Sequence, residues 1–210
     1  MREVVIFDLD GVLVESAPVV EASWRRWAGE RNVDWGALRP VLHGRPGREL
    51  VAEFAPALDV EAEVATITAY EMAEEGALRA IPGARECIEA APRWAIATSG
   101  GRELALGRLR AVGHPIPEVL ISADDITRGK PDPEPYLKAA AAMNAESDTC
   151  LVIEDAPAGI AAARAAGMRV VAVTTSHAPE DLSAADAVYG SMDEVRRAEL
   201  GTRAPAPRSP

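Results

Sequence analysis

The 210-residue sequence is poor in cysteine, in positive charge and in long apolar stretches. Its two cysteines, Cys87 and Cys150, form no CxxC motif, which argues against a disulfide framework or a zinc site and favours the reducing cytosol. The formal net charge of −11 argues against general attraction to nucleic acid or anionic membranes. No run approaches the roughly 18 apolar residues of a membrane span, and the N-terminus lacks the apolar stretch of a signal peptide. We therefore expect a soluble, cytoplasmic protein.

What the sequence does contain is a series of short apolar runs typical of strands buried on both faces. They cover residues 4–7, 94–98, 119–122, 150–153 and 170–173. Helix-like stretches at 102–112, 135–143 and 157–166 separate the last four runs. Gly113 and Gly167 stand just past two of these stretches, as helix C-terminal glycines do. This alternation predicts an α/β fold with a doubly wound, parallel, Rossmann-like sheet.

The connection between the first two predicted strands is unusually long. It spans about 85 residues, far more than one crossover helix needs. Apolar residues at three- and four-residue spacings predict helices throughout residues 17–80. We expect residues 16–81 to form a helical subdomain inserted into a sheet domain of residues 1–15 and 82–200. The tail at 201–210, rich in proline, is expected to be disordered.

Pairs of acidic residues follow two of the predicted strands directly. Asp8 and Asp10 follow the first strand, and Glu154 and Asp155 follow the fourth. The carboxyl ends of parallel strands share one edge, so we expect these carboxylates to meet there. The local alternatives are an Asp-Gly turn and an N-cap formed by Asp155. Four carboxylates at one edge need a cation among them, and oxygen ligands favour magnesium.

Two other loops offer what a phosphate group needs. The ATSGG segment after the second strand supplies the hydroxyls of Thr98 and Ser99 and backbone N–H groups around Gly100 at a helix N-terminus. Lys130 stands between a glycine and a proline in the loop after the third strand. A solvated surface lysine is the alternative interpretation. A fixed Lys130 would supply the local positive charge with which an acidic protein binds an anion.

Four motifs, in order, resemble the signatures of the haloacid dehalogenase-like hydrolase superfamily. They are DLDGVLVES (8–16), ATSG (97–100), GKPDPEPY (129–136) and EDAPAGI (154–160). The resemblance covers nearly the whole chain, and the predicted helical subdomain is similar to the family's helical cap. It implies a magnesium-dependent enzyme, a phosphoric monoester hydrolase. Asp10 favours phosphate esters over carbon–halogen bonds and phosphonates, because an alkoxide leaving group needs a proton.

The resemblance also implies roles for the four acidic residues. Asp8 would attack phosphorus and form an aspartyl-phosphate. Asp10 would protonate the leaving oxygen and then activate the hydrolytic water. Asp8, the backbone carbonyl of Asp10 and the side chain of Asp155 would hold Mg²⁺. Glu154 would support the metal through a bound water.

The remaining motif residues would handle the phosphoryl group. Thr98 would donate a hydrogen bond to a phosphoryl oxygen, helped by amides at Ser99 and Gly100. Lys130 would neutralise charge on the nucleophile and the phosphoryl group. In the cap, His43 and Arg45 are candidates for contacting the leaving group, with ordinary surface polar residues as the alternative.

Within the family, the sequence is most similar to helical-cap (subfamily I) phosphatases of glycerol phosphate, 2-deoxyglucose 6-phosphate and other sugar phosphates. The shared segments include HGR (43–45), EFAP (53–56) and IPGA (81–84). The β-phosphoglucomutase branch typically has a cap histidine and arginine where this chain has Val20 and Gly47. Both differences favour hydrolysis, with a displaced arginine at Arg45 or Arg48 as the alternative. We therefore expect a monomeric phosphatase of a small metabolite. A sugar-phosphate mutase is the alternative, and a non-catalytic metabolite-binding member is a more remote one.

Four further side chains have no role in this scheme. Trp24 and Trp27, three residues apart, are expected to pack on one helix face inside the cap. His114 and His177 are expected at the surface.

Overall fold

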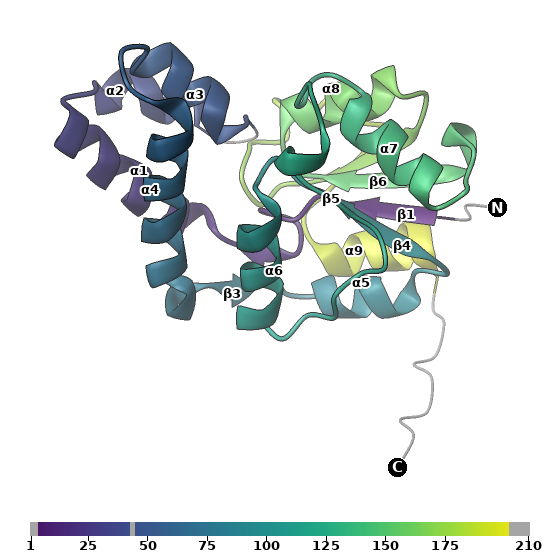
Figure 1. Ribbon diagram of the computed structural model, residues 1–210. Helices are drawn as coiled ribbons and strands as arrows, with labels where there is room; N and C mark the ends of the chain where they lie inside the picture. The colour runs from purple at the N-terminus through teal and green to yellow at the C-terminus, as the bar shows by residue number, and fades with distance from the viewer. Residues whose placement is uncertain (1–3, 43–44, 202–210) are drawn as a thin grey trace.

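The computed structural model describes residues 4–42 and 45–201, and its centre is a six-stranded parallel sheet (Figure 1). The strand order is β5-β4-β1-β6-β7-β8. The strands are β1 (Val4–Phe7), β4 (Trp94–Ala97), β5 (Leu120–Ile121), β6 (Cys150–Glu154), β7 (Arg169–Val173) and β8 (Ala187–Tyr189). From the central β1 the chain builds one side of the sheet and then the other, so the prediction of a doubly wound α/β fold is confirmed.

Successive side chains of β1 enter two separate hydrophobic cores. Val5 and Phe7 pack on the face covered by α5, α6 and α9, whereas Val4 and Ile6 pack on the face covered by α7 and α8. These helices are α5 (Ala84–Ala90), α6 (Arg102–Ala111), α7 (Glu134–Ala142), α8 (Pro157–Ala165) and α9 (Met192–Val195). Because helices cover both faces, the strands carry continuous apolar runs, and these runs predicted the strands from the sequence.

A second group of helices lies to one side of the sheet (Figure 1). It consists of α1 (Ala17–Arg31), α2 (Trp35–Leu38), α3 (Gly47–Phe54) and α4 (Val60–Ala73). Trp24 and Trp27 are buried in its core with ring centroids 5.5 Å apart, edge to face, as predicted. The segment is not one continuous helical stretch. Asp34 and Asp59 are non-helical residues whose side chains cap the starts of α2 and α4, so new helices begin there.

The two connections between this helical segment and the sheet pair with each other. Strand β2 (Val14–Glu15) and strand β3 (Arg79–Ala80) form a two-stranded antiparallel ribbon. Beside it, the amide of Ile81 donates a 3.1 Å hydrogen bond to the carbonyl of Leu13. The prediction of helix up to residue 80 is therefore wrong at its end. Both ends of the helical segment leave the sheet side by side.

The expectation that His114 lies at the surface is wrong. Its ring is buried, and its Nε2 lies 3.1 Å from the carbonyl oxygen of Leu13, just before the ribbon. Burial lowers the pKa of this imidazole, so the ring is held neutral. His177 is half-buried, and its Nδ1 lies 2.9 Å from the main-chain oxygen of Asp155.

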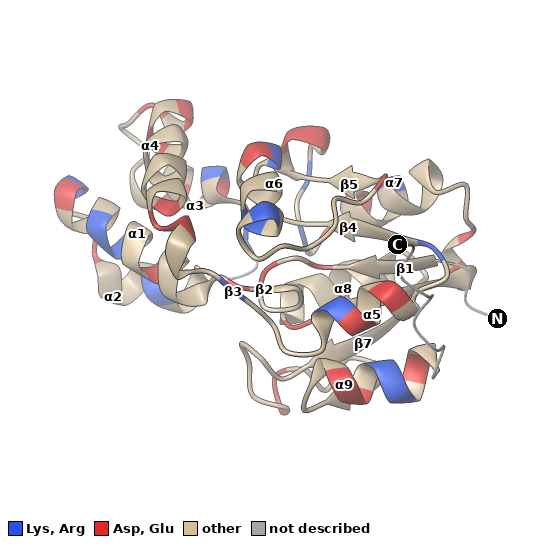
Figure 2. Ribbon diagram, turned by 90° about the horizontal axis from the view of Figure 1, so that it is seen from below, with Lys and Arg blue, Asp and Glu red and all other residues tan. Residues whose placement is uncertain are grey.

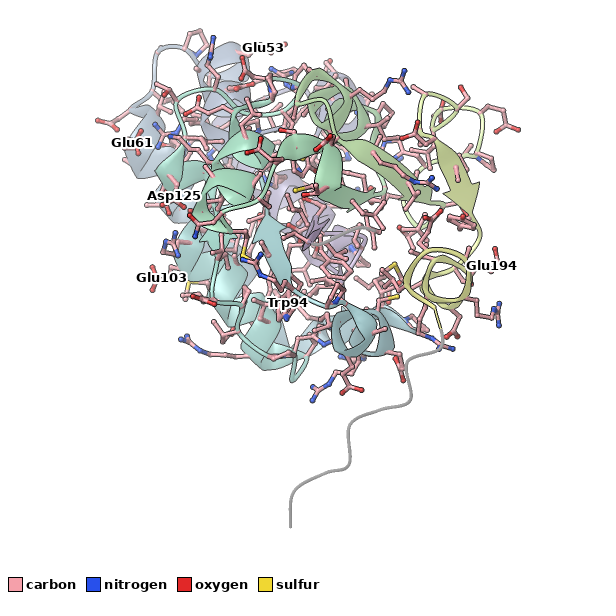
Figure 3. All side chains as sticks on the ribbon, turned by 90° about the vertical axis from the view of Figure 1, so that its right-hand side faces the viewer. Glu53, Glu61, Trp94, Glu103, Asp125 and Glu194 are labelled. Carbon is pink, nitrogen blue, oxygen red and sulfur yellow. The ribbon has the colours of Figure 1, made fainter. Side chains whose placement is uncertain are left out.

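Most charged side chains face outward. Figure 2 shows both signs interspersed on α5 and α9. Figure 3 places the labelled carboxylates of Glu53, Glu61, Glu103, Asp125 and Glu194 at the periphery of the molecule. Within the described ranges, no helix has the length and apolar character needed to cross a membrane. The few charged groups that are buried are therefore unusual.

Candidate active site

Three of the four carboxylates expected at this edge meet at the carboxyl ends of the two central strands, and the side chain of Asp10 is not part of this group. Asp8 directly follows β1, and Glu154 and Asp155 stand at the end of β6. The two strands are in register, because the amide of Asp8 donates a 3.0 Å hydrogen bond to the carbonyl of Ile153. One carboxylate oxygen from each acidic residue lies within 4.8 Å of the others. All three are buried, with exposed fractions of 7%, 1% and 4%.

Lys130 lies within this cluster rather than at the surface. Its Nζ is 2.6 Å from Oδ1 of Asp8 and 2.7 Å from Oε1 of Glu154, and the residue is 3% exposed. Burial alone lowers the pKa of a lysine, but the charges of Asp8 and Glu154 outweigh it and raise the pKa of Lys130 well above its usual range. The lysine is therefore a permanent cation bound to the two carboxylates.

Glu154 is held by hydrogen bonds on both oxygens. Oε1 accepts from Lys130 and from the hydroxyl of Tyr136 at 2.7 Å, and Oε2 accepts from the amides of Asp155 and Ala156. Burial alone would raise the pKa of Glu154. The charge of Lys130 and the hydrogen-bond donors outweigh burial, so the pKa is lowered. Gly159 makes room for this carboxylate, because a Cβ there would lie 1.6 Å from Oε1. Glu154 is thus a fixed anion.

Asp155 turns toward the loop after β1. Its side chain accepts a hydrogen bond from Ser176, and a Cβ on Gly11 would lie 1.9 Å from Oδ2. Gly11 has a φ of +81°, a conformation that suits glycine. The alternative that Asp155 caps α8 is wrong. The N-cap residue is Ala156, and α8 has no side-chain cap.

The cluster has more negative charge than Lys130 balances. Burial raises the pKa of Asp8 to about 7, with Glu154 and Asp10 adding to the increase and Lys130 opposing it. Burial and the charges of Glu154 and Asp8 also raise the pKa of Asp155 well above its usual range. A divalent cation would relieve this repulsion, and a donor set made only of oxygens fits Mg²⁺.

Asp10 is half-buried at the border between the sheet and the helical segment. Its Oδ1 accepts two hydrogen bonds of 2.6 Å, one from the hydroxyl of Ser16 and one from the guanidinium of Arg108 on α6. The same guanidinium donates to Glu71 on α4. Asp10 therefore bonds directly to Ser16 and Arg108 and is linked through Arg108 to Glu71.

The loop after β4 lies beside the carboxylates. Thr98 is buried, and its Oγ1 accepts a 3.1 Å hydrogen bond from the amide of Gly100. Ser99 and Gly100 precede α6, which begins at Arg102. Thr98, Ser99 and Gly100 line the same cavity as the carboxylates, and their hydroxyl and backbone N–H groups form a polar rim suited to an anion.

One cavity of about 550 Å³ connects these groups with the helical segment. Every predicted site residue in the described ranges lines it: Asp8, Asp10, Arg45, Thr98, Ser99, Gly100, Lys130, Glu154 and Asp155. Its far wall includes Val20, Trp24 and Gly47. The guanidinium of Arg45 lies 2.8 Å from Glu53. His43 lies outside the described residues, as does the predicted tail from residue 202.

Sequence reasoning gave no site role to many residues that line this cavity. Among them are Trp24, Glu71, Arg108, Ser176 and His177. Arg108 carried a usable signal, because Leu104 and Ala105, four and three residues earlier on the same side of α6, are apolar and buried. An arginine on the apolar face of a helix needs a buried partner.

Comparison with known proteins agrees with this geometry. Residues 3–167 match the family model of the haloacid dehalogenase-like hydrolases. Hexitol phosphatase A of Escherichia coli is 34% identical, covering 90% of this chain and 91% of its own. Validoxylamine A 7'-phosphate phosphatase of Streptomyces hygroscopicus is 36% identical, covering 96% and 99%. The crystal structure of CbbY from Rhodobacter sphaeroides in complex with phosphate superposes with a TM-score of 0.83 at 25% identity, covering 93% and 96%. The chain belongs to the haloacid dehalogenase-like hydrolase family.

Proposed function

We propose that this chain, a phosphoric monoester hydrolase by its family and relatives, is a magnesium-dependent phosphatase of a small sugar or polyol phosphate. The observation that carries the proposal is the buried pairing of Asp8 with Lys130, with Asp10 in the same cavity. A carboxylate held 2.6 Å from a permanent cation is oriented for attack, and the cation lowers the repulsion between nucleophile and phosphate.

The reaction has two steps. An oxygen of Asp8 attacks phosphorus, the bond between phosphorus and the ester oxygen breaks, and Asp10 gives that oxygen a proton. Asp10 then takes a proton from water as the water oxygen attacks the phosphorus of the aspartyl-phosphate. The bond between Asp8 and phosphorus breaks, and inorganic phosphate leaves.

Asp8, the main-chain carbonyl of Asp10 and Asp155 would hold Mg²⁺, with Glu154 supporting it through a water. When bound, the metal supplies positive charge that the transferring phosphoryl group needs. The buried cluster supports this assignment, because Asp8, Glu154 and Asp155 bring three carboxylates together and Lys130 supplies a single positive charge.

The phosphoryl oxygens would be bound by the polar rim. Thr98 donates its hydroxyl proton, and the amides of Ser99 and Gly100 add neutral donors at the start of α6. Lys130 neutralises the charge shared between Asp8 and the phosphoryl group. These contacts align the phosphorus with the nucleophile, which is most of what phosphoryl transfer requires.

The helical segment, residues 16–81, would act as a cap that selects the leaving group. Arg45 lines the cavity and is proposed to contact the substrate, and His43 is proposed to do the same. Val20 and Gly47 line the same cavity at the places where the mutase branch typically has a histidine and an arginine, which favours hydrolysis over the mutase reaction. Arg45 and Arg48 line it too, so the mutase alternative would bind its second phosphate through one of these arginines. The relatives named as phosphatases of hexitol phosphate and glycerol 1-phosphate support a polyol or sugar ester as substrate.

The test is release of inorganic phosphate from glycerol phosphate, hexose 1- and 6-phosphates and deoxyhexose phosphates. Each ester is assayed with and without magnesium, and Asp8→Asn serves as the blank. We expect release that requires magnesium and is absent from the variant, which should stay folded because an amide replaces a repelled carboxylate of the same size. Turnover by Asp8→Asn would contradict the mechanism. Conversion of β-glucose 1-phosphate without phosphate release would favour a mutase.

A further inference from the structure

Arg108 is a charged residue in an unusual place. It lies within α6 and is 3% exposed, whereas its neighbour Arg110 on the same helix is exposed. A buried guanidinium persists only when anions compensate its lost hydration. Here the charges of Asp10 and Glu71 outweigh the effect of burial and raise the pKa of Arg108.

The two partners of Arg108 come from different parts of the molecule. Nη1 donates a 2.6 Å hydrogen bond to Oδ1 of Asp10, which follows β1, and Nη2 donates to Oε2 of Glu71 near the end of α4. Among the ion pairs of residues 4–42 and 45–201, this bond to Glu71 alone joins the helical segment to the sheet domain. Glu71 is 5% exposed, so both charges are shielded from solvent.

The two carboxylate oxygens of Asp10 differ in the hydrogen bonds that they accept. Oδ1 accepts from both Arg108 and Ser16, at 2.6 Å each. None of the hydrogen bonds found in the described part of the chain uses Oδ2. A carboxylate anchored through one oxygen by two donors has a fixed rotation about its side-chain bonds, and the other oxygen stays available for proton transfer.

We propose, on the basis of the proposed function, that Arg108 is a positioning residue that holds Asp10 for proton transfer, and that Glu71 holds Arg108. Docking of α4 against α6 thereby fixes the orientation of the acid–base group. A proton is transferred efficiently only within hydrogen-bond reach of its acceptor, so a loosened Asp10 loses rate in the step that needs its proton.

This proposal is tested with two esters that differ in their need for a proton. The nitrophenolate released from p-nitrophenyl phosphate is stable as an anion, whereas glycerol 1-phosphate must release a protonated alcohol. Rapid-mixing measurements follow the first phosphoryl transfer for each ester in Arg108→Met, Arg108→Ala and Glu71→Gln. Arg110→Met, an exposed arginine on the same helix, is the matched control.

In Arg108→Met we expect the first step with glycerol 1-phosphate to slow by about 100-fold, the size of a lost general-acid contribution. The burst of nitrophenolate should change by no more than about threefold, since that step does not depend on the proton. Glu71→Gln should change the rates of the first step with the two esters in the same direction as Arg108→Met does. In the Arg108→Met background, the Glu71→Gln substitution should cause no further change in these rates. Added guanidinium ion should restore glycerol 1-phosphate cleavage in Arg108→Ala.

Equal losses on both esters in Arg108→Met and Glu71→Gln would overturn the positioning role and leave the proposed hydrolysis intact. A retained nitrophenolate burst shows that a variant has folded around a working Asp8. If the unmodified protein gives no burst and no phosphate release, the proposed function fails, and the inference fails with it.

Discussion

The ammonium nitrogen of Lys130 lies 2.6 Å from Oδ1 of Asp8, although 122 positions separate the two residues in the chain. The loop after β5 carries the lysine past β4 to the middle of the sheet edge. There it also contacts Glu154, so one cation compensates anions from two strands. The buried charges at this edge depend on that lysine for stability as well as for chemistry.

Replacing Lys130 by methionine removes this cation and keeps the volume of the side chain. Two buried carboxylates would lose their partner, so we expect destabilisation of about 3 to 5 kcal/mol and loss of turnover. Arg110→Met is the control, because Arg110 is an exposed residue of α6 and its replacement should change the stability by no more than about 0.5 kcal/mol. Urea unfolding of both variants measures the difference, and equal small changes would show that the buried pairs are not stabilising.

Magnesium should stabilise the folded protein. At a concentration 100 times the dissociation constant, binding adds about 2.7 kcal/mol, which corresponds to a rise of the unfolding temperature on the order of 5 to 10 °C. Thermal unfolding in EDTA and in magnesium checks this. Asp155→Asn should remove most of the shift, while Asp181→Asn, an exposed residue far from the cluster in sequence, should keep it. A shift that survives in Asp155→Asn would place the metal elsewhere.

The pKa of Glu134 predicts an acid-sensitive contribution to stability. A hydrogen bond from Lys138 and the amides of Thr127 and Arg128 lower this pKa from 4.5 to about 2. A lowered pKa in the folded state stabilises the protein above pH 4.5, and this contribution is lost as the pH falls toward 2. Glu134→Gln should therefore be less stable than the parent at pH 7, with a difference that shrinks on acidification. Urea unfolding across this range tests it, with the exposed Glu146→Gln as control.

Arg45 should affect substrate binding more than catalysis. It lines the cavity from the helical segment, away from Asp8 and Lys130, and one face of its guanidinium already pairs with Glu53. Loss of a charge-assisted hydrogen bond to the substrate should raise KM about tenfold in Arg45→Ala with little change in kcat. Arg39→Ala, which removes an exposed pair outside the cavity, should change neither constant. A drop in kcat alone would place Arg45 in the chemical step.

The central strands were predictable from sequence because helices cover both of their faces. Strands β1, β4, β6 and β7 lie within one residue of the predicted runs. The edge strand β8 was missed, since Ala187–Tyr189 is three residues long and half-buried. Its three residues are all apolar, but so short a run cannot be told from a loop by sequence. The β2–β3 ribbon was missed for a different reason, because two-residue strands pair only once the helical segment has folded between them.

The site followed from sequence where its residues stand at strand ends. Asp8, Glu154 and Asp155 are brought together by strand register alone, so their order in the chain predicted their proximity. The pairing of Arg108 with Glu71 was beyond such reasoning, because it depends on how α4 packs against α6. Helix packing of that kind leaves no fixed spacing in the sequence.

The β2–β3 ribbon brings together the two places where the backbone enters and leaves the helical segment, which favours its exchange for the corresponding segment of a relative. Its entry at Glu15 and its exit at Arg79 are direct partners in the ribbon. A segment grafted from a relative would therefore need to match this one backbone junction and to supply a partner for Arg108 in place of Glu71, and the strand order of the sheet would stay unchanged. In such a chimaera the recipient keeps Asp8, Lys130 and Asp155, while the donor supplies the wall that faces the leaving group.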